Sequence, residues 1–125
     1  EYAKIFDNYY GTSKNFVNKL HQQKFDVVFD IDWQGTKKLS KFKNLKLIKI
    51  YLIASNKEEL KKRLITRNQN TAAEIEKRFN SFDDDIKHWK DYDYIIINQN
   101  LDNCFKQIEN IITQEKQSIS SQIIQ

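Results

Sequence analysis

The chain has 125 residues, of which 39% are hydrophobic and 30% are charged, and its formal net charge at pH 7 is +4. This composition is typical of one soluble globular domain and excludes an intrinsically disordered chain. The absence of an apolar run of membrane-spanning length, and a single cysteine that excludes an internal disulfide, favour a cytoplasmic protein without a membrane partner.

The N-terminal part predicts a turn followed by a helix. Residues 1–12 are aromatic and polar, and Gly11 permits a turn at their end. Ser13 is placed to cap a helix that runs to about residue 23. The chain therefore enters its first regular element through a short aromatic segment.

An apolar run over about residues 25–31 predicts a strand buried on both faces. Asp30 and Asp32 stand at its end, just before Gly35 and a short helix over about residues 35–42. Open α/β sheets bind ligands at the C-terminal ends of their parallel strands. The acids therefore indicate either a ligand site or a strand that ends in solvent with two hydrated carboxylates.

Residues 45–53 predict a second buried strand, and Ser55 with Glu58 matches a capping box that begins the next helix. A second capping box, Thr71 with Glu74, begins a longer helix. The apolar positions of this helix recur at steps of four and three residues: Ile75, Phe79, Phe82, Ile86 and Trp89.

A third buried strand is predicted over residues 94–97, followed by a closing helix. Cys104 falls among its apolar positions and is interpreted as a packing residue, and the polar tail from Thr113 is expected to fray. The remaining apolar positions are Leu101, Phe105, Ile108 and Ile112. Strands alternate with helices along the chain, so the fold class is α/β, with a parallel sheet joined by right-handed crossovers.

The arginines are concentrated in one segment. The chain has 18 lysines, spread along its length, but only three arginines, which are Arg63, Arg67 and Arg78. A guanidinium group grips phosphate through a planar fork of donors, whereas lysine supplies only a point charge. The cluster indicates either phosphate binding or surface ion pairs, and the spread of lysine disfavours nucleic-acid binding.

Other chemistry is poorly supported. Gly11 and Gly35 stand too far apart for a Walker or Rossmann glycine loop. His21 and His88 lack metal-ligand spacing and are interpreted as surface or boundary residues. The acidic run at residues 83–85 is interpreted as a solvated helix face, because successive helix residues point in different directions.

Several blocks of sequence occur in an order and spacing that resemble the guanylate kinases. They are Asn-Tyr-Tyr-Gly-Thr-Ser at residues 8–13, Asp-Ile-Asp-Trp-Gln-Gly at 30–35, Arg-Leu-Ile-Thr-Arg at 63–67, Glu-Lys-Arg at 76–78 and Tyr-Asp-Tyr-Ile-Ile-Ile-Asn at 92–98. The resemblance extends to about residue 116. It implies a three-layer fold like that of the P-loop NTPases, with a parallel sheet flanked by helices, incomplete at the N-terminus.

The resemblance also implies a division of the chain. Residues 1–12 match the end of a GMP-binding subdomain, and residues 13–125 match the core α/β domain. A helical lid is expected over about residues 63–82.

By the same resemblance, the full-length protein is an enzyme that transfers the γ-phosphate of ATP to GMP and uses Mg²⁺. Glu1 matches the acid that reads the guanine edge, and Thr12 matches a hydroxyl that contacts the base. Tyr10 matches a tyrosine that binds the GMP phosphate. Asp30 and Asp32 match the acids beneath GMP, with Asp30 nearer the metal and able to hold it through water.

The lid residues follow from the resemblance as well. Arg67 and Arg78 match the catalytic arginines that clamp the phosphates. Asp30 is the third catalytic residue that the resemblance implies. Arg63 lies behind them, and Asn98 matches a residue beside the adenine, so Arg63, Arg67 and Asn98 form the implied ATP contacts.

The chain departs from the family pattern at several positions, including Asn68, Gln99 and the Ala-Ser pair at residues 54–55. It also lacks the P-loop of the family and an initiator methionine, so we expect a piece of a longer protein that is inactive by itself. The alternatives are a non-catalytic module that binds a phosphorylated peptide and a truncated product without function. The protein is expected to be a monomer or homodimer.

Overall fold

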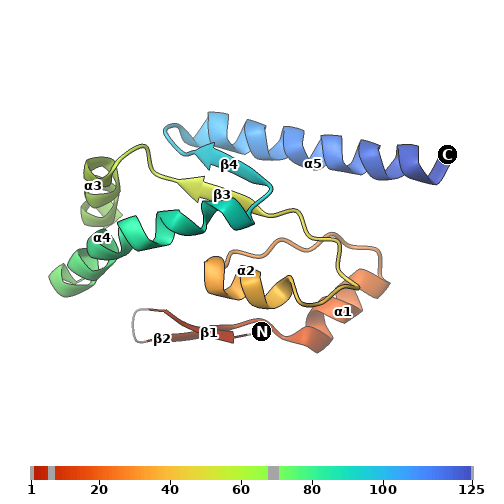
Figure 1. Cartoon of the computed structure of the whole chain (residues 1–125), viewed down its shortest axis with the longest axis horizontal. Coiled ribbons are helices and arrows are strands. Elements are labelled where there is room, and N and C mark those ends of the chain that lie inside the picture. The colour runs from red at the N-terminus through yellow and green to blue at the C-terminus, as the bar shows by residue number, and fades with distance from the viewer. Residues whose placement is uncertain (1, 6–7, 68–70, 125) are drawn as a thin grey trace.

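The computed structural model describes residues 2–5, 8–67 and 71–124 of the chain (Figure 1). The N-terminal elements are β1 (Tyr2–Ile5), β2 (Asn8–Gly11), α1 (Lys14–Gln22) and α2 (Trp33–Leu39). The remaining elements are β3 (Ile50–Ile53), α3 (Lys57–Arg67), α4 (Ala72–Ile86), the 3₁₀ helix η1 (Lys87–Asp91), β4 (Tyr94–Ile97) and α5 (Leu101–Ile124).

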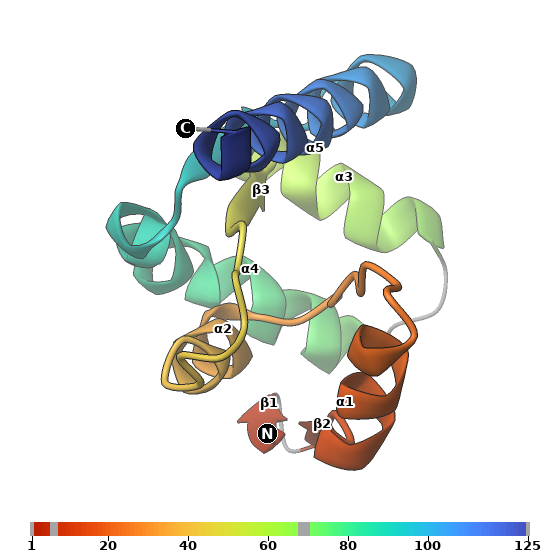
Figure 2. The ribbon, with the colours of Figure 1, turned by 90° about the vertical axis from the view of Figure 1, so that its right-hand side faces the viewer.

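The strands β3 and β4 form a parallel pair, with Ile50 opposite Tyr94 and Ile53 opposite Ile97. The chain passes from one to the other through α3, α4 and η1, and α5 then crosses one face of the pair while α4 lies on the other (Figures 1 and 2). The strands β1 and β2 form a separate antiparallel hairpin. The predicted α/β class, with helices on both faces of a parallel sheet, is confirmed.

The core beneath α5 consists of buried residues from the sheet and the helix. Ile96, Cys104 and Ile111 are buried together, and the half-buried Ile108 packs against them. The interpretation of Cys104 as a packing residue is confirmed. Because residues 104, 108 and 111 are spaced by four and three, they form the stripe of α5 that faces the sheet.

The predicted inner face of the closing helix was partly wrong. Leu101 and Phe105 are 78% and 59% exposed, because the stripe through Cys104 turns them to the flank of α5. The prediction of a frayed tail from Thr113 was also wrong, since α5 continues to Ile124.

The predicted buried strand over residues 25–31 was wrong as well. This segment has no regular secondary structure and joins no ladder with any strand of the described chain, and Val28 is 87% exposed. A strand forms only where a neighbour accepts and donates its backbone hydrogen bonds. For the same reason the second predicted strand, over residues 45–53, is shortened to β3, the part that lies opposite β4.

Helix starts depend on single side chains. Ser13 caps α1 as predicted, and its hydroxyl accepts a hydrogen bond from the Phe16 amide at 3.3 Å. The first capping box, with Ser55 as the cap, was wrong. Asn56 performs this role instead, because its Oδ1 accepts a hydrogen bond from the Glu59 amide at 2.8 Å.

The capping box at the start of α4 is confirmed. The Thr71 hydroxyl accepts from the Glu74 amide at 3.2 Å, and Glu74 Oε2 accepts from the Thr71 amide at 3.0 Å. We expect Thr71→Ala to lower the free energy of unfolding by about 1 kcal/mol, because it leaves a helix-terminal amide without this partner. Urea denaturation of the variant measures the change.

The matched control is Thr66→Ala, because the Thr66 hydroxyl donates to the Lys62 carbonyl within α3 and caps nothing. We expect Thr66→Ala to change the free energy of unfolding by less than about 0.5 kcal/mol. Equal changes in both variants would contradict a stabilising role for the cap.

Candidate functional site

A cleft with a volume of about 200 Å³ lies between β3, α3 and α4. Arg78 and Asp85 from α4 line it together with Tyr51 and Leu52 from β3 and Leu64 from α3. Apolar side chains make up most of the lining, which also includes one arginine and one carboxylate. This arrangement can bind an anionic group beside an apolar one.

The helix that carries Arg78 is fastened at its C-terminal end. The Tyr51 hydroxyl donates to the Asp85 carbonyl oxygen at 2.9 Å, which joins β3 to the last turn of α4. The Ser81 hydroxyl lies 3.0 Å from the Arg78 carbonyl oxygen and 3.1 Å from Asp85 Oδ2. The last turn of α4 is therefore held against the sheet, and Ser81 connects that turn to the Arg78 backbone.

Burial of the Tyr51 phenol, with the nearby Asp85 charge, raises its pKa from 10.0 to about 12. The folded state then keeps its proton where the unfolded state loses it, so the stability contributed by this group is present below pH 10 and is lost as pH rises from 10 to about 12. We expect the stability of Tyr51→Phe to decrease less steeply than that of the wild type between pH 10 and about 12. Unfolding midpoints measured from pH 8 to 12 test it, and an unchanged slope would contradict the assignment.

Arg63 and Asn98 are brought together by the fold. Arg63 Nη2 donates to the Asn98 carbonyl oxygen, and Arg63 Nε lies 3.3 Å from Glu59 Oε1. The Asn98 amide donates to the Ile53 carbonyl at 2.7 Å and so extends the pairing of β3 with β4. Arg63 therefore fastens α3 to the end of the sheet, while Arg67 is exposed in the last turn of the same helix.

The two candidate acids differ in their surroundings. Asp32 caps α2, because its Oδ1 accepts from the Gly35 amide at 3.0 Å and its Oδ2 accepts from Gln34 Nε2 at 3.2 Å. This cap explains why α2 begins at Trp33, two residues before the predicted start. Asp30 is exposed and has no hydrogen bond or ion pair with any residue in the described part of the chain. Its carboxylate can therefore accept an external ligand.

Two contacts join α2 to the segment that follows α4. The rings of Trp33 and His88 are stacked, with centroids 3.7 Å apart and planes inclined by 7°. The Tyr92 hydroxyl donates to Thr36 Oγ1 at 3.1 Å. Sequence reasoning missed both contacts, and no local signal reveals them, because the partners stand more than 50 residues apart. His88 is half-buried, as a boundary residue should be.

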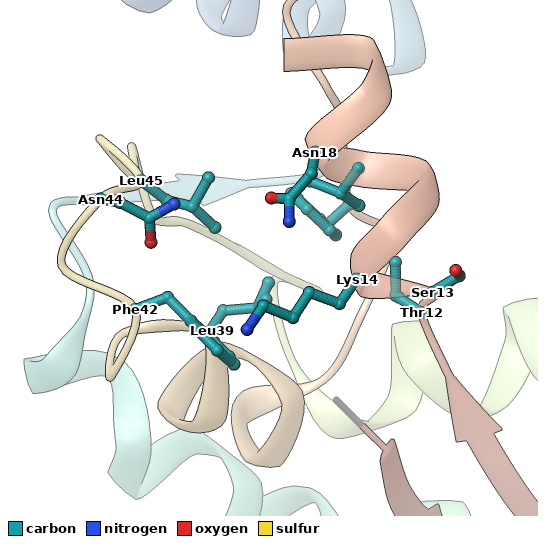
Figure 3. Close-up of a pocket in the computed structure, with 10 residues that line it drawn as sticks. Thr12, Ser13, Lys14, Asn18, Leu39, Phe42, Asn44 and Leu45 are labelled. Atoms are coloured by element: carbon teal, nitrogen blue, oxygen red, sulfur yellow. The ribbon is translucent and has the colours of Figure 1, made fainter. Parts of the chain in front are cut away.

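Thr12 lies beside a small cavity of about 30 Å³ between α1, α2 and residues 44–45 (Figure 3). The Lys14 side chain extends across it toward the Phe42 ring, which its ammonium approaches to 5.4 Å from the centroid. A volume of this size holds about one water molecule and no nucleobase. The cavity is therefore a packing gap, not a nucleotide site.

Glu1 lies outside the described residues, and Tyr10 is placed by its backbone alone, opposite Ala3 in the hairpin. The acidic run at residues 83–85 is divided. Asp83 and Asp84 are exposed in ion pairs with lysines, as a solvated face requires, whereas Asp85 is half-buried and its Oδ2 accepts a hydrogen bond from the Ser81 hydroxyl.

Among the residues that the structure describes, no cluster of three or more histidine, cysteine or acidic side chains is arranged to hold a metal ion. Within the same part of the chain, no helix has both the length and the apolar character needed to cross a membrane. A metal bound near Asp30 would thus need ligands from a bound substrate or from water.

Comparison with known proteins gives a consistent result. The guanylate kinase family model matches residues 1–115. The chain is 40% identical to a guanylate kinase of Zymomonas mobilis over 93% of its own length and 54% of that protein. It is also 40% identical to a guanylate kinase of Rickettsia felis, over 94% of its own length and 60% of that protein.

The fold agrees with a solved structure. A crystal structure of guanylate kinase from Anaplasma phagocytophilum superposes with a TM-score of 0.75 at 25% identity, covering 92% of this chain and 54% of that one. The chain thus spans little more than half the length of the relatives it matches.

Proposed function

Because this chain belongs to the guanylate kinase family, we propose that the protein containing it transfers the γ-phosphate of ATP to GMP and forms ADP and GDP. The observation that carries the proposal is the family match over residues 1–115. The position of Arg78 in a cleft beside β3 supports it.

Phosphoryl transfer is catalysed mainly by positioning and by stabilisation of charge. We assign this work to Arg67 and Arg78, which would clamp the phosphates from α3 and α4. Arg63 is engaged with Glu59 and the Asn98 carbonyl, so its assigned role is to hold α3 and Asn98 beside the ATP site.

Asp30 is proposed to hold Mg²⁺ through water. The exposed carboxylate fits this ion, which is usually bound by one or two carboxylates together with substrate phosphates. When bound, Mg²⁺ would neutralise phosphate charge. Asp32, whose carboxylate caps α2, would lie beneath GMP in an orientation set by that helix.

GMP recognition is proposed for residues near the N-terminus. Glu1 would accept hydrogen bonds from the N–H groups on the guanine edge, which adenine does not supply. Thr12 would contact the base and Tyr10 the phosphate. In this assignment residues 1–12 end a GMP-binding subdomain, residues 13–125 form the core domain, and residues 63–82 form the lid.

The partners of the protein are proposed to be GMP and ATP, without nucleic acid or membrane. A cytoplasmic location is supported by a chain whose single cysteine is a buried packing residue. We propose a monomer or homodimer.

The test is a coupled assay of ADP formation with the protein expressed from its complete natural gene. We expect GMP to exceed AMP, CMP and UMP in kcat/KM by at least about 100-fold, because a site built to hydrogen-bond one base leaves its polar groups unpaired with another. The 125-residue chain alone is expected to show no measurable turnover. Phosphopeptide binding without phosphorylation of any nucleotide would contradict the proposal.

A further inference from the structure

The helix α2, which Asp32 caps, and the helix α4, which carries Arg78, are joined by a continuous set of side-chain contacts. The Trp33 ring, at the first position of α2, stacks on the His88 ring in η1 at a centroid distance of 3.7 Å. The near-parallel planes and short separation are those of a formed aromatic stack. Figures 1 and 2 both show α2 beside the end of α4, where η1 begins.

A chain of hydrogen bonds runs parallel to this stack. The Tyr92 hydroxyl donates to Thr36 Oγ1 at 3.1 Å, and Thr36 Oγ1 donates to the Asp32 carbonyl oxygen at 2.9 Å. Burial raises the pKa of Tyr92, so its phenol keeps the proton that it donates. The backbone of Asp32 is therefore connected to Tyr92, two residues before β4.

The connection continues to α4 through a second tyrosine. The rings of Tyr92 and Tyr51 meet edge to face at 4.9 Å, and the Tyr51 hydroxyl donates to the Asp85 carbonyl at 2.9 Å. Asp85 lies two turns after Arg78 on the same helix. Together with the pairing of β3 and β4, these contacts connect α2 to α4 and so set the distance between Asp32 and Arg78.

We infer that Trp33, His88, Tyr92 and Tyr51 are positioning residues, which hold the acids Asp30 and Asp32 in register with Arg78 during phosphoryl transfer. This inference rests on the proposed function. We call these four side chains the aromatic link. None of them needs to touch a substrate for the aromatic link to act.

The aromatic link has a distinct kinetic consequence. Each substrate is bound by groups on one side of the link, so weakening it leaves the KM values for GMP and ATP nearly unchanged. Phosphoryl transfer requires both sides to be aligned at the same moment, so kcat falls. A variant that only lost stability would also lower the apparent kcat at unchanged KM, so kcat is divided by the folded fraction measured by urea denaturation, and the loss must persist after that correction.

The experiment measures kcat and KM for variants of the protein expressed from its complete natural gene. We expect His88→Ala to lower kcat about three- to tenfold, the factor that corresponds to the loss of one aromatic contact, with both KM values within about twofold. His88→Phe keeps a stacking ring without an ionisable group, and we expect it to restore kcat to within about twofold of the wild type.

Trp89→Phe is the matched control, because Trp89 is the neighbour of His88 but is 43% exposed and contacts Lys90 instead of α2. We expect it to leave kcat unchanged. A normal kcat in His88→Ala, or an equal loss in His88→Ala and His88→Phe, would overturn the inference.

A second readout does not depend on activity. Gly35 donates its amide to Asp32 Oδ1, so its hydrogen exchange reports the start of α2. We expect His88→Ala, but not His88→Phe, to accelerate this exchange about three- to tenfold. If the wild type phosphorylates no nucleotide, the proposed function fails, and hydrogen exchange alone then tests whether the aromatic link holds the start of α2. An unchanged Gly35 exchange rate in His88→Ala would overturn the inference.

Discussion

Replacement of Arg78 by lysine is expected to lower kcat by about 100- to 1,000-fold, which is the usual cost of removing one preorganised donor from a transition state. Lysine keeps the positive charge but loses the planar fork that contacts two phosphate oxygens together. The free energy of unfolding should change by less than about 1 kcal/mol, because lysine keeps the positive charge and the aliphatic stem at this position.

Arg67→Lys is expected to act in the same direction, since Arg67 is exposed in the last turn of α3. Lys62→Ala on the exposed side of the same helix is the control, and its kcat should match the wild type. Steady-state assays and urea denaturation separate the two effects. Normal turnover in both arginine variants would contradict their assignment to the phosphates.

Asp30→Asn is expected to lower kcat by roughly 100-fold and to raise the Mg²⁺ concentration needed for half-maximal rate, because the amide is neutral and binds Mg²⁺ poorly. Its stability should be unchanged, since Asp30 has no partner in the described part of the chain. Titration of the rate with MgCl₂ measures the shift.

Asp32→Asn provides a matched comparison. Asparagine is as good an N-cap as aspartate, so the start of α2 should survive and any loss of rate should come from the missing charge. We expect a smaller effect on the Mg²⁺ dependence than in Asp30→Asn. Equal Mg²⁺ dependence in the wild type and Asp30→Asn would contradict the assignment of the metal to Asp30.

Features that depend on near neighbours in the chain were predicted well. The caps at Ser13 and Thr71 and the bounds of β4 at residues 94–97 are confirmed. Each of these depends on a side chain within four positions or on a short continuous run of apolar residues, so the sequence contains all the information needed. The sequence blocks, taken in their order and spacing, also sufficed to identify the family. They contain the residues needed for the chemistry as well as those needed for the fold.

Features that depend on distant partners were predicted poorly. The apolar run at residues 25–31 has a strand's composition but no ladder in the described structure, and Asn56, not Ser55, caps α3. The contacts of Arg63 with Asn98 and of Trp33 with His88 join residues 35 and 55 positions apart. Nothing in the sequence around either partner identifies the other.

The sequence by itself therefore determined the α/β class, most helix starts, the family and the residue types available for phosphate chemistry. The tertiary structure alone decided which of these residues are already engaged: Arg63 fastens a helix and Asp32 caps one, while Asp30 is exposed. The physical reason is that a side chain's type sets what it can bind, whereas its partners are set by packing between elements far apart in the chain.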